Sequence, residues 1–490
     1  MIDVLIAGAG PVGSTLAADL VRRGLDVRLI DKAPRAFEGS RAKGIQPRTQ
    51  ELFEDLGVLD EALAEGGPYP LMGVHLGPIT VPWRMQRKHR PTAAVPYPDI
   101  LLLPQSRTDA VLHRLLQRLG QHIEFGTTLE GFVQDEDGVT TTLASGEQVR
   151  SRFLVGADGG GSAVRKAAGI RFAGETDQTD RTLLVDAVID GLSRDRWHVW
   201  PGLGGMYVGA CPLPHSELFQ LMIRLRPDET PDVAEAALAA RFQARTGLRL
   251  RDVAWTSVFR PNVRIVERYR VGRVFVAGDA AHVHTPAGAQ GLNTGVQDAY
   301  NLGWKLGQVL AGAPDALLDS YELERRPIAA HVLGRSSELY AGIDKNRLAS
   351  MKRGDEERQL ELSYFGGPLA PAAVPATRTL RVGDRAPDSP YDGPGARRLF
   401  EAFRGPHFTL LAFGPEAAEI LPQLTWPAGG AALHRIEIGS SSAAADTYGI
   451  TGDALVLIRP DGYIGAIVTA DWESSFADAI LTLGAVACQS

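Results

Sequence analysis

Cysteine is almost absent from this chain of 490 residues, in which only Cys211 and Cys488 occur. Two cysteines so far apart form neither a C-x-x-C pair nor a disulfide framework, as is typical of proteins in a reducing compartment. No run comes near the roughly 18 uninterrupted apolar residues of a membrane-spanning helix. The first apolar run follows Asp3 and no basic segment, which predicts a core strand and not a signal peptide. We therefore expect a cytoplasmic protein with no membrane partner.

A strong excess of one charge is also lacking. The chain has 51 Lys and Arg against 58 Asp and Glu, a formal net charge of −7. This mildly acidic balance gives no electrostatic reason to bind nucleic acid, and we expect none as a partner. The chain is too long for a single hydrophobic core, so two or three domains are expected.

Glycine, in contrast, is clustered near the start. The stretch MIDVLIAGAGPVGSTLAADLVRRGLDVRLIDK places Gly8, Gly10 and Gly13 in a G-x-G-x-x-G spacing directly after an apolar run. The run predicts a short buried strand, the segment from Val12 onward a helix, and DVRLI a second strand that ends at Asp31. This order of strand, turn, helix, strand and acid is typical of a dinucleotide-binding fold.

These residue types match the chemistry of a dinucleotide. The first glycine permits the tight turn, the second lets a pyrophosphate approach the backbone, and the third lets helix and strand pack closely. The helix N-terminus faces the phosphates. Asp31, followed by Lys32, can accept a hydrogen bond from a ribose hydroxyl. The pattern alone leaves open whether NAD(P) or FAD is bound.

Two further glycine motifs favour FAD. In FLVGADGGGSAVRKAAG a strand leads into Asp158, and in VGRVFVAGDAAHVHTPAGAQGLNTGVQDAYNLGWKL a strand leads into Gly278 and Asp279. A carboxylate at a strand end can accept from a sugar-alcohol hydroxyl. The helix expected after GAQGLN has free N–H groups that point out of its N-terminus. Reduced flavin carries negative charge at N1–C2=O, and such groups stabilise that charge.

Between about Ile170 and Arg264 the pattern changes to alternating runs such as TLLVDAVIDGL, GGMYVGACPLP and LFQLMIRLRP, broken by one helix. The alternation predicts an antiparallel sheet with one covered face. Its aromatic and Met side chains are individually more often core than ligand contacts. His198, Tyr207, His215 and Arg224 are candidates for substrate contact, but no substrate residue is assigned.

With these three motifs in order, the sequence resembles the single-component FAD-dependent aromatic hydroxylases of the para-hydroxybenzoate hydroxylase class. Within that class it most resembles the actinomycete hydroxylases of aromatic polyketides. The resemblance extends to SRAKGIQPRTQELFEDLG, LPQSRTDAVL and SYELERRPIA. The tail, which opens with VGDRAPD and ends with YGITGDALVLIRPDGYIGAIV, resembles the thioredoxin-like C-terminal domain of the larger members.

The resemblance implies a fold and a domain division. The fold class would be α/β, a Rossmann-like FAD-binding domain with an inserted antiparallel-sheet substrate domain and a C-terminal thioredoxin-like domain. The FAD-binding domain would comprise residues 1–70, 101–170 and 266–378, and the substrate-binding domain residues 71–100 and 171–265. The thioredoxin-like domain would comprise residues 379–490 and lacks a redox pair, because Cys488 is its only cysteine.

The resemblance also implies residue roles. Arg41 would reach the flavin side, Gln105 the ribityl chain and Asp279 the ribityl or pyrophosphate region, while the backbone of Leu129 would meet the adenine. The Pro286 carbonyl would lie close to the reactive flavin carbon, which makes Pro286 the one residue assigned to the catalytic centre. The full set of implied FAD contacts is Gly8, Gly10, Val12, Gly13, Asp31, Lys32, Arg41, Gln105, Leu129, Asp158, Gly278, Asp279, Gly291, Leu292 and Asn293.

The implied reaction is a monooxygenation of a bulky aromatic small molecule. NAD(P)H reduces a tightly but non-covalently bound FAD, O₂ adds at C4a, and the distal oxygen of the hydroperoxyflavin passes to an electron-rich ring. NADPH or NADH would bind transiently, because the chain has no second complete G-x-G-x-x-G followed by an acid. No metal is expected, since His282 and His284 have no third ligand at a suitable spacing. Whether the protein is a monomer or a homodimer stays open.

Three alternatives remain. A phenol hydroxylase or an antibiotic-modifying flavin monooxygenase, including one of Baeyer–Villiger type, would use the same motifs. A flavoprotein reductase normally has a second nucleotide domain or a redox disulfide, and the sequence shows neither. A non-enzymatic FAD-binding module would leave the middle sheet without a purpose.

Overall fold

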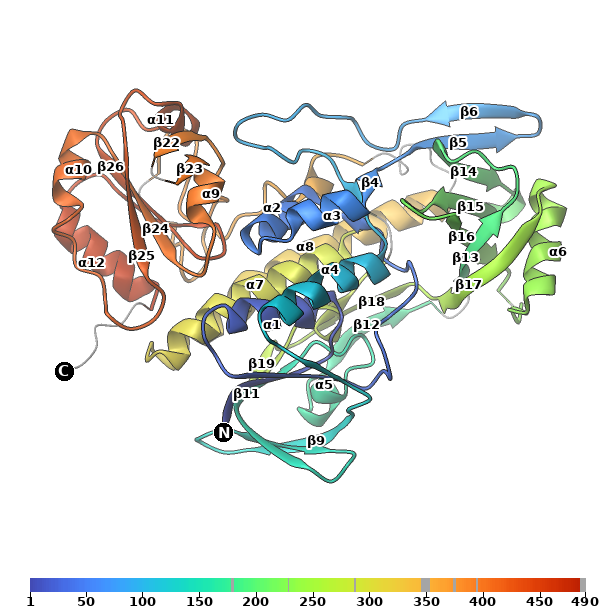
Figure 1. The fold of residues 1–490 in the computed structure, drawn as a ribbon, viewed down its shortest axis with the longest axis horizontal. Helices are drawn as coiled ribbons and strands as arrows, with labels where there is room; N and C mark the ends of the chain where they lie inside the picture. Colours follow the sequence, from blue (N-terminus) through green and yellow to red (C-terminus); the bar gives the residue numbers. More distant parts are fainter. Residues whose placement is uncertain are drawn as a thin grey trace.

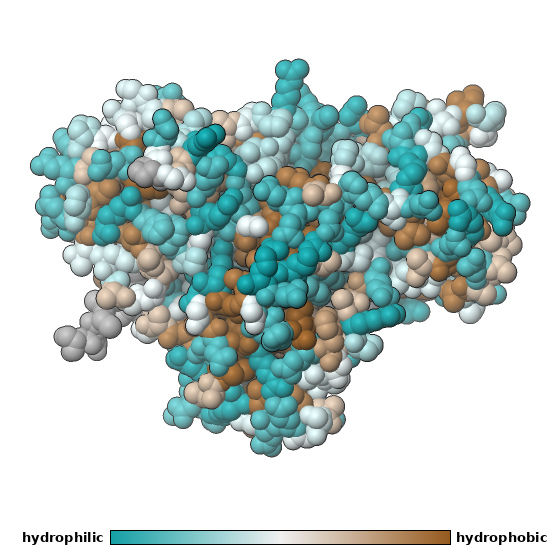
Figure 2. Space-filling model, viewed as in Figure 1, coloured by the Kyte–Doolittle hydropathy of each residue, from teal (hydrophilic) through white to brown (hydrophobic). Residues whose placement is uncertain are grey.

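The computed structural model describes residues 1–177, 180–227, 229–285, 288–344, 353–372, 376–393 and 395–484. It is a mixed α/β molecule in which a large sheet lies below a group of central helices (Figure 1). A second large sheet lies to the right of these helices and a smaller one to the left. Within the described ranges, no helix is both long and apolar enough to span a bilayer. Hydrophilic residues cover much of the face shown in Figure 2, with hydrophobic patches among them.

The large sheet carries the first glycine motif. Its strands run in the order β19-β20-β11-β1-β2-β8, and β10 and β9 extend from β11. Val4, Leu5 and Ile6 of β1 are fully buried, as expected for a parallel strand that is covered on both faces. The strands of this sheet are β1 (Ile2–Ala7), β2 (Val27–Asp31), β8 (Ile123–Phe125), β9 (Leu129–Gln134), β10 (Val139–Leu143), β11 (Gln148–Gly156), β19 (Arg270–Val271) and β20 (Val274–Val276).

Helix α1 is the centre of the helical layer and packs against α4 and α7. It begins at Pro11, whose missing N–H costs nothing in a first helical turn. The helices of this part are α1 (Pro11–Val21), α2 (Pro47–Asp55), α3 (Leu59–Glu65), α4 (Gln105–Arg118), α5 (Ala163–Ala167), α7 (Gly291–Leu310) and α8 (Asp319–Asp344).

The second sheet has seven strands in the order β17-β13-β16-β15-β14-β5-β6. It is antiparallel except for the parallel pair β14 and β5. Side chains alternate between its two faces, so Leu183 and Val185 pack with α6 (Glu235–Thr246) while Thr182 and Leu184 point the other way. The strands are β5 (Leu71–Leu76), β6 (Ile79–Trp83), β13 (Arg181–Ile189), β14 (Arg196–Pro201), β15 (Tyr207–Pro212), β16 (Leu218–Leu225) and β17 (Leu250–Phe259).

Two small sheets connect these layers, β12-β18-β21 and β3-β7-β4. Because β3 directly follows the loop that holds Arg41, the sheet β3-β7-β4 fixes the end of that loop. The strands are β3 (Gly44–Ile45), β4 (Gly67–Pro68), β7 (Leu101–Leu102), β12 (Phe172–Thr176), β18 (Asn262–Val266) and β21 (His282–Val283).

The C-terminal part has its own four-stranded sheet in the order β25-β24-β26-β27. Strand β24 is parallel to β25 and antiparallel to β26, which pairs with β27 in an antiparallel hairpin. Its elements are β22 (Pro390–Gly393), β23 (Ala396–Arg398), α9 (Leu399–Phe403), β24 (Phe408–Phe413), α10 (Pro415–Ile420), β25 (Leu433–Ile438), α11 (Ala443–Tyr448), β26 (Ala454–Ile458), β27 (Ile464–Val468) and α12 (Trp472–Thr482).

Buried charges join this C-terminal part to the helices. Arg459, after β26, lies 2.7 Å from Glu324 of α8, and Lys305 of α7 lies 2.7 Å from the same carboxylate. All three side chains are fully buried. Removing one partner of such a group leaves an uncompensated charge, which is strongly destabilising. The C-terminal part is therefore held against the helices by charge pairing as well as by apolar contact.

Candidate functional site

One cavity of about 850 Å³ runs between the large sheet and the seven-stranded sheet. One end is lined by the loops after β1, β2 and β11. The other end is lined by side chains of β13, β14, β15, β16 and β17. We call these the nucleotide end and the ring end.

At the nucleotide end, the three glycines of the first motif have different surroundings. Gly8 has φ +106°, and a Cβ there would lie 2.4 Å from the Ala157 carbonyl oxygen. A Cβ on Gly13 would lie 1.8 Å from the carbonyl oxygen of Gly8. A Cβ on Gly10, which lines the cavity, would have no protein atom within 4 Å. Gly8 and Gly13 are thus needed for the fold of the turn, whereas Gly10 leaves room for a ligand.

Helix α1 begins at this turn with free donors. Gly10 is its N-cap, and no side chain caps the helix there. The first N–H groups of a helix lack partners within the helix and carry the positive end of its dipole. This end of the cavity is therefore suited to a phosphate or pyrophosphate.

Asp31 is oriented by the same turn. Its carboxylate accepts hydrogen bonds from the backbone N–H of Ala9 at 2.7 Å and of Ala33 at 2.8 Å. Asp31 also lines the cavity, together with Lys32 and Leu129. The carboxylate is held at a strand end where it can accept from a ribose hydroxyl.

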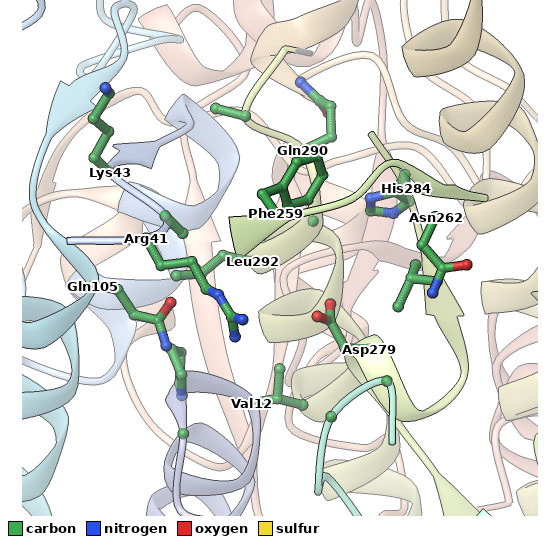
Figure 3. A pocket seen from close by; sticks show the side chains of 18 of the residues that line it. Val12, Arg41, Lys43, Gln105, Phe259, Asn262, Asp279, His284, Gln290 and Leu292 are labelled. Atoms are coloured by element: carbon green, nitrogen blue, oxygen red, sulfur yellow. The ribbon is translucent and has the colours of Figure 1, made fainter. Parts of the chain in front are cut away.

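Three polar side chains line the middle of the cavity, Arg41, Gln105 and Asp279. Figure 3 shows Arg41 and Asp279 pointing toward one another from opposite walls. Burial raises the pKa of Asp279, and the charges of His282 and Arg41 partly offset that rise. Gly278, just before it, has φ +58° and would place a Cβ 2.7 Å from Val12, so glycine keeps this strand end close to α1.

Asp158 closes the cavity wall after β11. One carboxylate oxygen, Oδ2, accepts from the N–H of Ala163 at 2.7 Å at the start of α5. The other, Oδ1, is buried and has no hydrogen-bond partner among the described residues. A buried acceptor without a partner costs free energy, so a bound hydroxyl or water at this point would be stabilising.

Around the start of α7, Gly291 and Leu292 line the cavity but the Asn293 side chain does not. Asn293 is fully buried; it donates to the carbonyl oxygens of Gly44 and Ala289 and accepts from the N–H of Gln46. Its side chain therefore fixes the loop before β3. Pro286 lies outside the described residues, as does Cys488.

The two histidines of this segment differ in their surroundings, and no cluster of metal-ligating side chains occurs in the described part of the chain. His282 is buried on β21 and lies 2.6 Å from Asp298, which also pairs with Arg325 at 2.7 Å. His284 lines the cavity, and burial together with the charge of His282 lowers its pKa to about 3. Of these two histidines, His284 lines the cavity and His282 does not.

The structure thus brings most of the expected cofactor residues to one cavity. Gly13, Gly278 and Asn293 act behind its wall, through packing and loop support. The residues that line it are Gly8, Gly10, Val12, Asp31, Lys32, Arg41, Gln105, Leu129, Asp158, Asp279, Gly291 and Leu292.

At the ring end, Tyr207 is the one cavity-lining residue among the four substrate candidates. His198 lies 2.8 Å from His75, His215 bonds the Gly66 carbonyl, and Arg224 pairs with Asp180 at 3.1 Å. Residues that no sequence pattern assigned to the site are Lys43, Tyr69, Thr182, Leu184, Gln220, Tyr340 and Arg353. The alternation along β13 and β16 could have identified Thr182, Leu184 and Gln220 as sharing a face, but not which face meets the cavity.

These features fit FAD. A turn without a Cβ and an uncapped helix suit a pyrophosphate, and the carboxylates of Asp31 and Asp279 suit sugar hydroxyls. The cavity continues toward a sheet face whose apolar side chains, Leu184, Trp197 and Met222, suit a ring. The orphaned oxygen of Asp158 supplies a further acceptor in the same wall.

Comparisons with known proteins agree with this assignment. The family model described as FAD binding domain matches residues 1–336. A flavin-dependent monooxygenase of Mycobacteroides abscessus is 42% identical over 479 residues, 95% of this chain and 97% of the relative. The 6-methylpretetramide 4-monooxygenase of Streptomyces rimosus is 35% identical over 510 residues, 95% of this chain and 90% of the relative.

Among solved structures, a ternary complex of aklavinone-11 hydroxylase with FAD and aklavinone is similar over 99% of both chains. Its TM-score is 0.82 at 26% sequence identity. Sequence and structure agree over nearly the whole length, so the likeness is not confined to the nucleotide motifs. The chain belongs to the FAD binding domain family and, within it, to the FAD-dependent aromatic monooxygenases.

Proposed function

We propose that this enzyme uses NAD(P)H and O₂ to hydroxylate a bulky, polycyclic aromatic substrate bound at the ring end. The observation that carries the proposal is the continuity of the cavity, which joins the nucleotide motifs to the open face of the seven-stranded sheet. The relatives named for 6-methylpretetramide and aklavinone support a polyketide-like substrate.

The nucleotide end would hold FAD through backbone and carboxylate groups. Gly10 and the first turn of α1 would meet the pyrophosphate, Asp31 the adenosine ribose, and Leu129 the adenine. When bound, FAD would accept a hydride from NAD(P)H and activate O₂ for transfer of one oxygen atom to an electron-rich ring. Gly291 and Leu292 would place the N-terminus of α7 against the negative charge of the reduced flavin.

The chain would also exclude water from the reaction. Leu184, Met222, Val258 and Phe259 give the ring end an apolar wall, and Tyr340 of α8 closes another side. A dry site disfavours loss of activated oxygen as hydrogen peroxide. These residues orient and shield the substrate and do not themselves transfer a proton.

The domain division follows from the same proposal. Residues 1–70, 101–170 and 266–378 would form the FAD-binding domain, and residues 71–100 and 171–265 an inserted substrate domain. Residues 379–490 would form a thioredoxin-like domain, which is supported by the strand order β25-β24-β26-β27 with one parallel pair. The protein would act in the cytoplasm, where NAD(P)H is supplied.

The test is a panel of polycyclic aromatic compounds offered to the purified protein with NADPH or NADH. We expect a yellow protein, slow NAD(P)H oxidation that accelerates when an aromatic compound binds, and a product heavier by one oxygen. A Baeyer–Villiger product has the same mass but is an ester or lactone that opens in alkali. Fast NAD(P)H oxidation without any aromatic compound would instead support a reductase and overturn the proposal.

A further inference from the structure

Lys43 is a buried cation in the wall of the ring end. Its side chain lines the cavity and is only 8% exposed. The ammonium donates a hydrogen bond to the neutral Oε1 of Gln220 and lies 4.4 Å from the centre of the Trp197 ring. In Figure 3 the Lys43 side chain points away from Arg41 and Asp279, so it does not belong to the part of the cavity suited to the pyrophosphate.

No carboxylate touches this ammonium. None of the ion pairs among the described residues includes Lys43. Asp186 is linked to Gln220 through the neutral Ser40: Gln220 donates to Ser40 at 2.6 Å, and Ser40 donates to Asp186 at 2.5 Å and 2.8 Å. Asp186, Gln220 and Cys211 lie directly across from one another on β13, β16 and β15.

A lysine in this position is costly for the protein alone. Burial lowers the pKa of Lys43, and the neighbouring Cys211 and Asp186 oppose that change only in part. A buried ammonium that has no carboxylate partner is stabilised when a ligand brings an anionic group to it. The charge of Arg194 acts on Cys211 and that of Arg353 on Tyr69, and burial raises the pKa values of Cys211 and Tyr69, which keeps both neutral.

We propose that Lys43 is the specificity-determining residue that binds the oxyanion of an acidic ring hydroxyl. The substrate O–H bond breaks with its electron pair left on the oxygen, the proton passes to water, and the Lys43 ammonium donates a hydrogen bond to the oxyanion. The substrate class is therefore a polycyclic phenol or hydroxyquinone with an ionisable hydroxyl. This inference rests on the proposed function and adds the group that the substrate must carry.

The experiment uses two quinones that differ only in the ionisable group. The probe is 2-hydroxyanthraquinone, whose visible band moves to longer wavelength on ionisation, and the matched control is 2-methoxyanthraquinone. Both are titrated into the FAD-bound enzyme over a range of pH. The variants are Lys43→Met, Lys43→Arg and, as a control for net charge, Lys166→Met at an exposed lysine of α5.

With the native enzyme we expect bound 2-hydroxyanthraquinone to ionise at a lower pH than the free dye. Lys43→Met should weaken its binding by roughly tenfold to a hundredfold and abolish this shift, because a charge-assisted hydrogen bond is lost. Lys43→Arg should recover part of the affinity. Binding of 2-methoxyanthraquinone, flavin absorbance and the melting temperature should change little in Lys43→Met, and Lys166→Met should match the native enzyme.

Equal binding of the hydroxy compound by Lys43→Met and native enzyme would overturn the inference. So would a bound dye that ionises at the same pH as the free dye. A native enzyme that holds FAD but binds neither quinone would also overturn it, whereas a chain that holds no FAD would overturn the proposed function itself.

Discussion

The two ends of the cavity are built in different ways. At the nucleotide end, backbone groups of a glycine-rich turn, which contains Gly8, Gly10 and Gly13, form the site. At the ring end, side chains from five strands make it, with Lys43 added from a loop far away in the sequence. A site made by the backbone permits only residues that fit its turn, such as glycine. A site made by side chains depends on how the strands pair and can accept different side chains. Substitutions should therefore do more damage at the nucleotide end than at the ring end.

The largest effect is expected for Gly13→Ala. Its Cβ would lie 1.8 Å from the carbonyl oxygen of Gly8, which no side-chain movement can relieve. We expect the variant to be insoluble or to lack flavin, because α1 must move away from the strand that carries Gly8. Expression, flavin content and circular dichroism measure this outcome.

The matched control for this prediction is Gly10→Ala in the same turn. Its methyl group would meet no protein atom within 4 Å and would point into the cavity. This variant should fold with native secondary structure and lose FAD affinity only. If Gly13→Ala bound FAD as the native chain does, the nucleotide end would be far more adaptable than its geometry indicates.

A smaller effect, on stability, is expected from the acid buried behind the nucleotide end. Asp109 of α4 is 2% exposed, and burial raises its pKa from 3.8 to about 8, against a hydrogen bond from Gln105 that lowers it. Because the folded pKa lies above the unfolded one, the contribution of Asp109 to stability is fully present below about pH 4 and is lost as pH rises through about 8. Asp109→Asn, which cannot ionise, should avoid this loss.

Asp109→Asn should thus match the native protein near pH 4 and exceed it near pH 8 by on the order of a few kcal/mol. Denaturation with saturating FAD at both pH values measures the difference. The exposed Asp446, changed to Asn, is the control and should show no such divergence. A gap between Asp109→Asn and native protein that stays constant with pH would contradict the prediction.

The sequence predicted the strand, turn and helix of the nucleotide end because local rules specify them. A strand, a glycine turn and a helix follow one another within the first motif, so the positions of Gly8, Asp31 and α1 can be inferred without any long-range contact. The α/β class followed from the same pattern. The helix after the third motif was also expected, and α7 begins at Gly291.

The ring end could not be predicted in the same way. Gln220 meets Lys43 only because β16 pairs with β13 and β15 in one register, and a shift by one residue would turn its side chain to the α6 face. Lys43 itself sits in a polar loop, where a lysine is usually solvated. The side chain of Asn293 has partners that no local pattern reveals either, because its amide donates to the carbonyl oxygens of Gly44 and Ala289.

The smallest effect we expect tests the tolerance of the ring end through Trp197. The indole ring lines the cavity, lies 4.4 Å from the Lys43 ammonium and meets Tyr69 edge to face at 5.9 Å. Trp197→Leu removes an aromatic surface on which a polycyclic ring can stack, worth about 0.5 to 1.5 kcal/mol, so affinity for a polycyclic aromatic compound should fall by up to about tenfold. FAD content should not change, because no group at the nucleotide end depends on this ring. Trp197→Phe keeps an aromatic face and should lose less affinity, so equal losses in the two variants would show that volume, and not the ring, decides binding at this end.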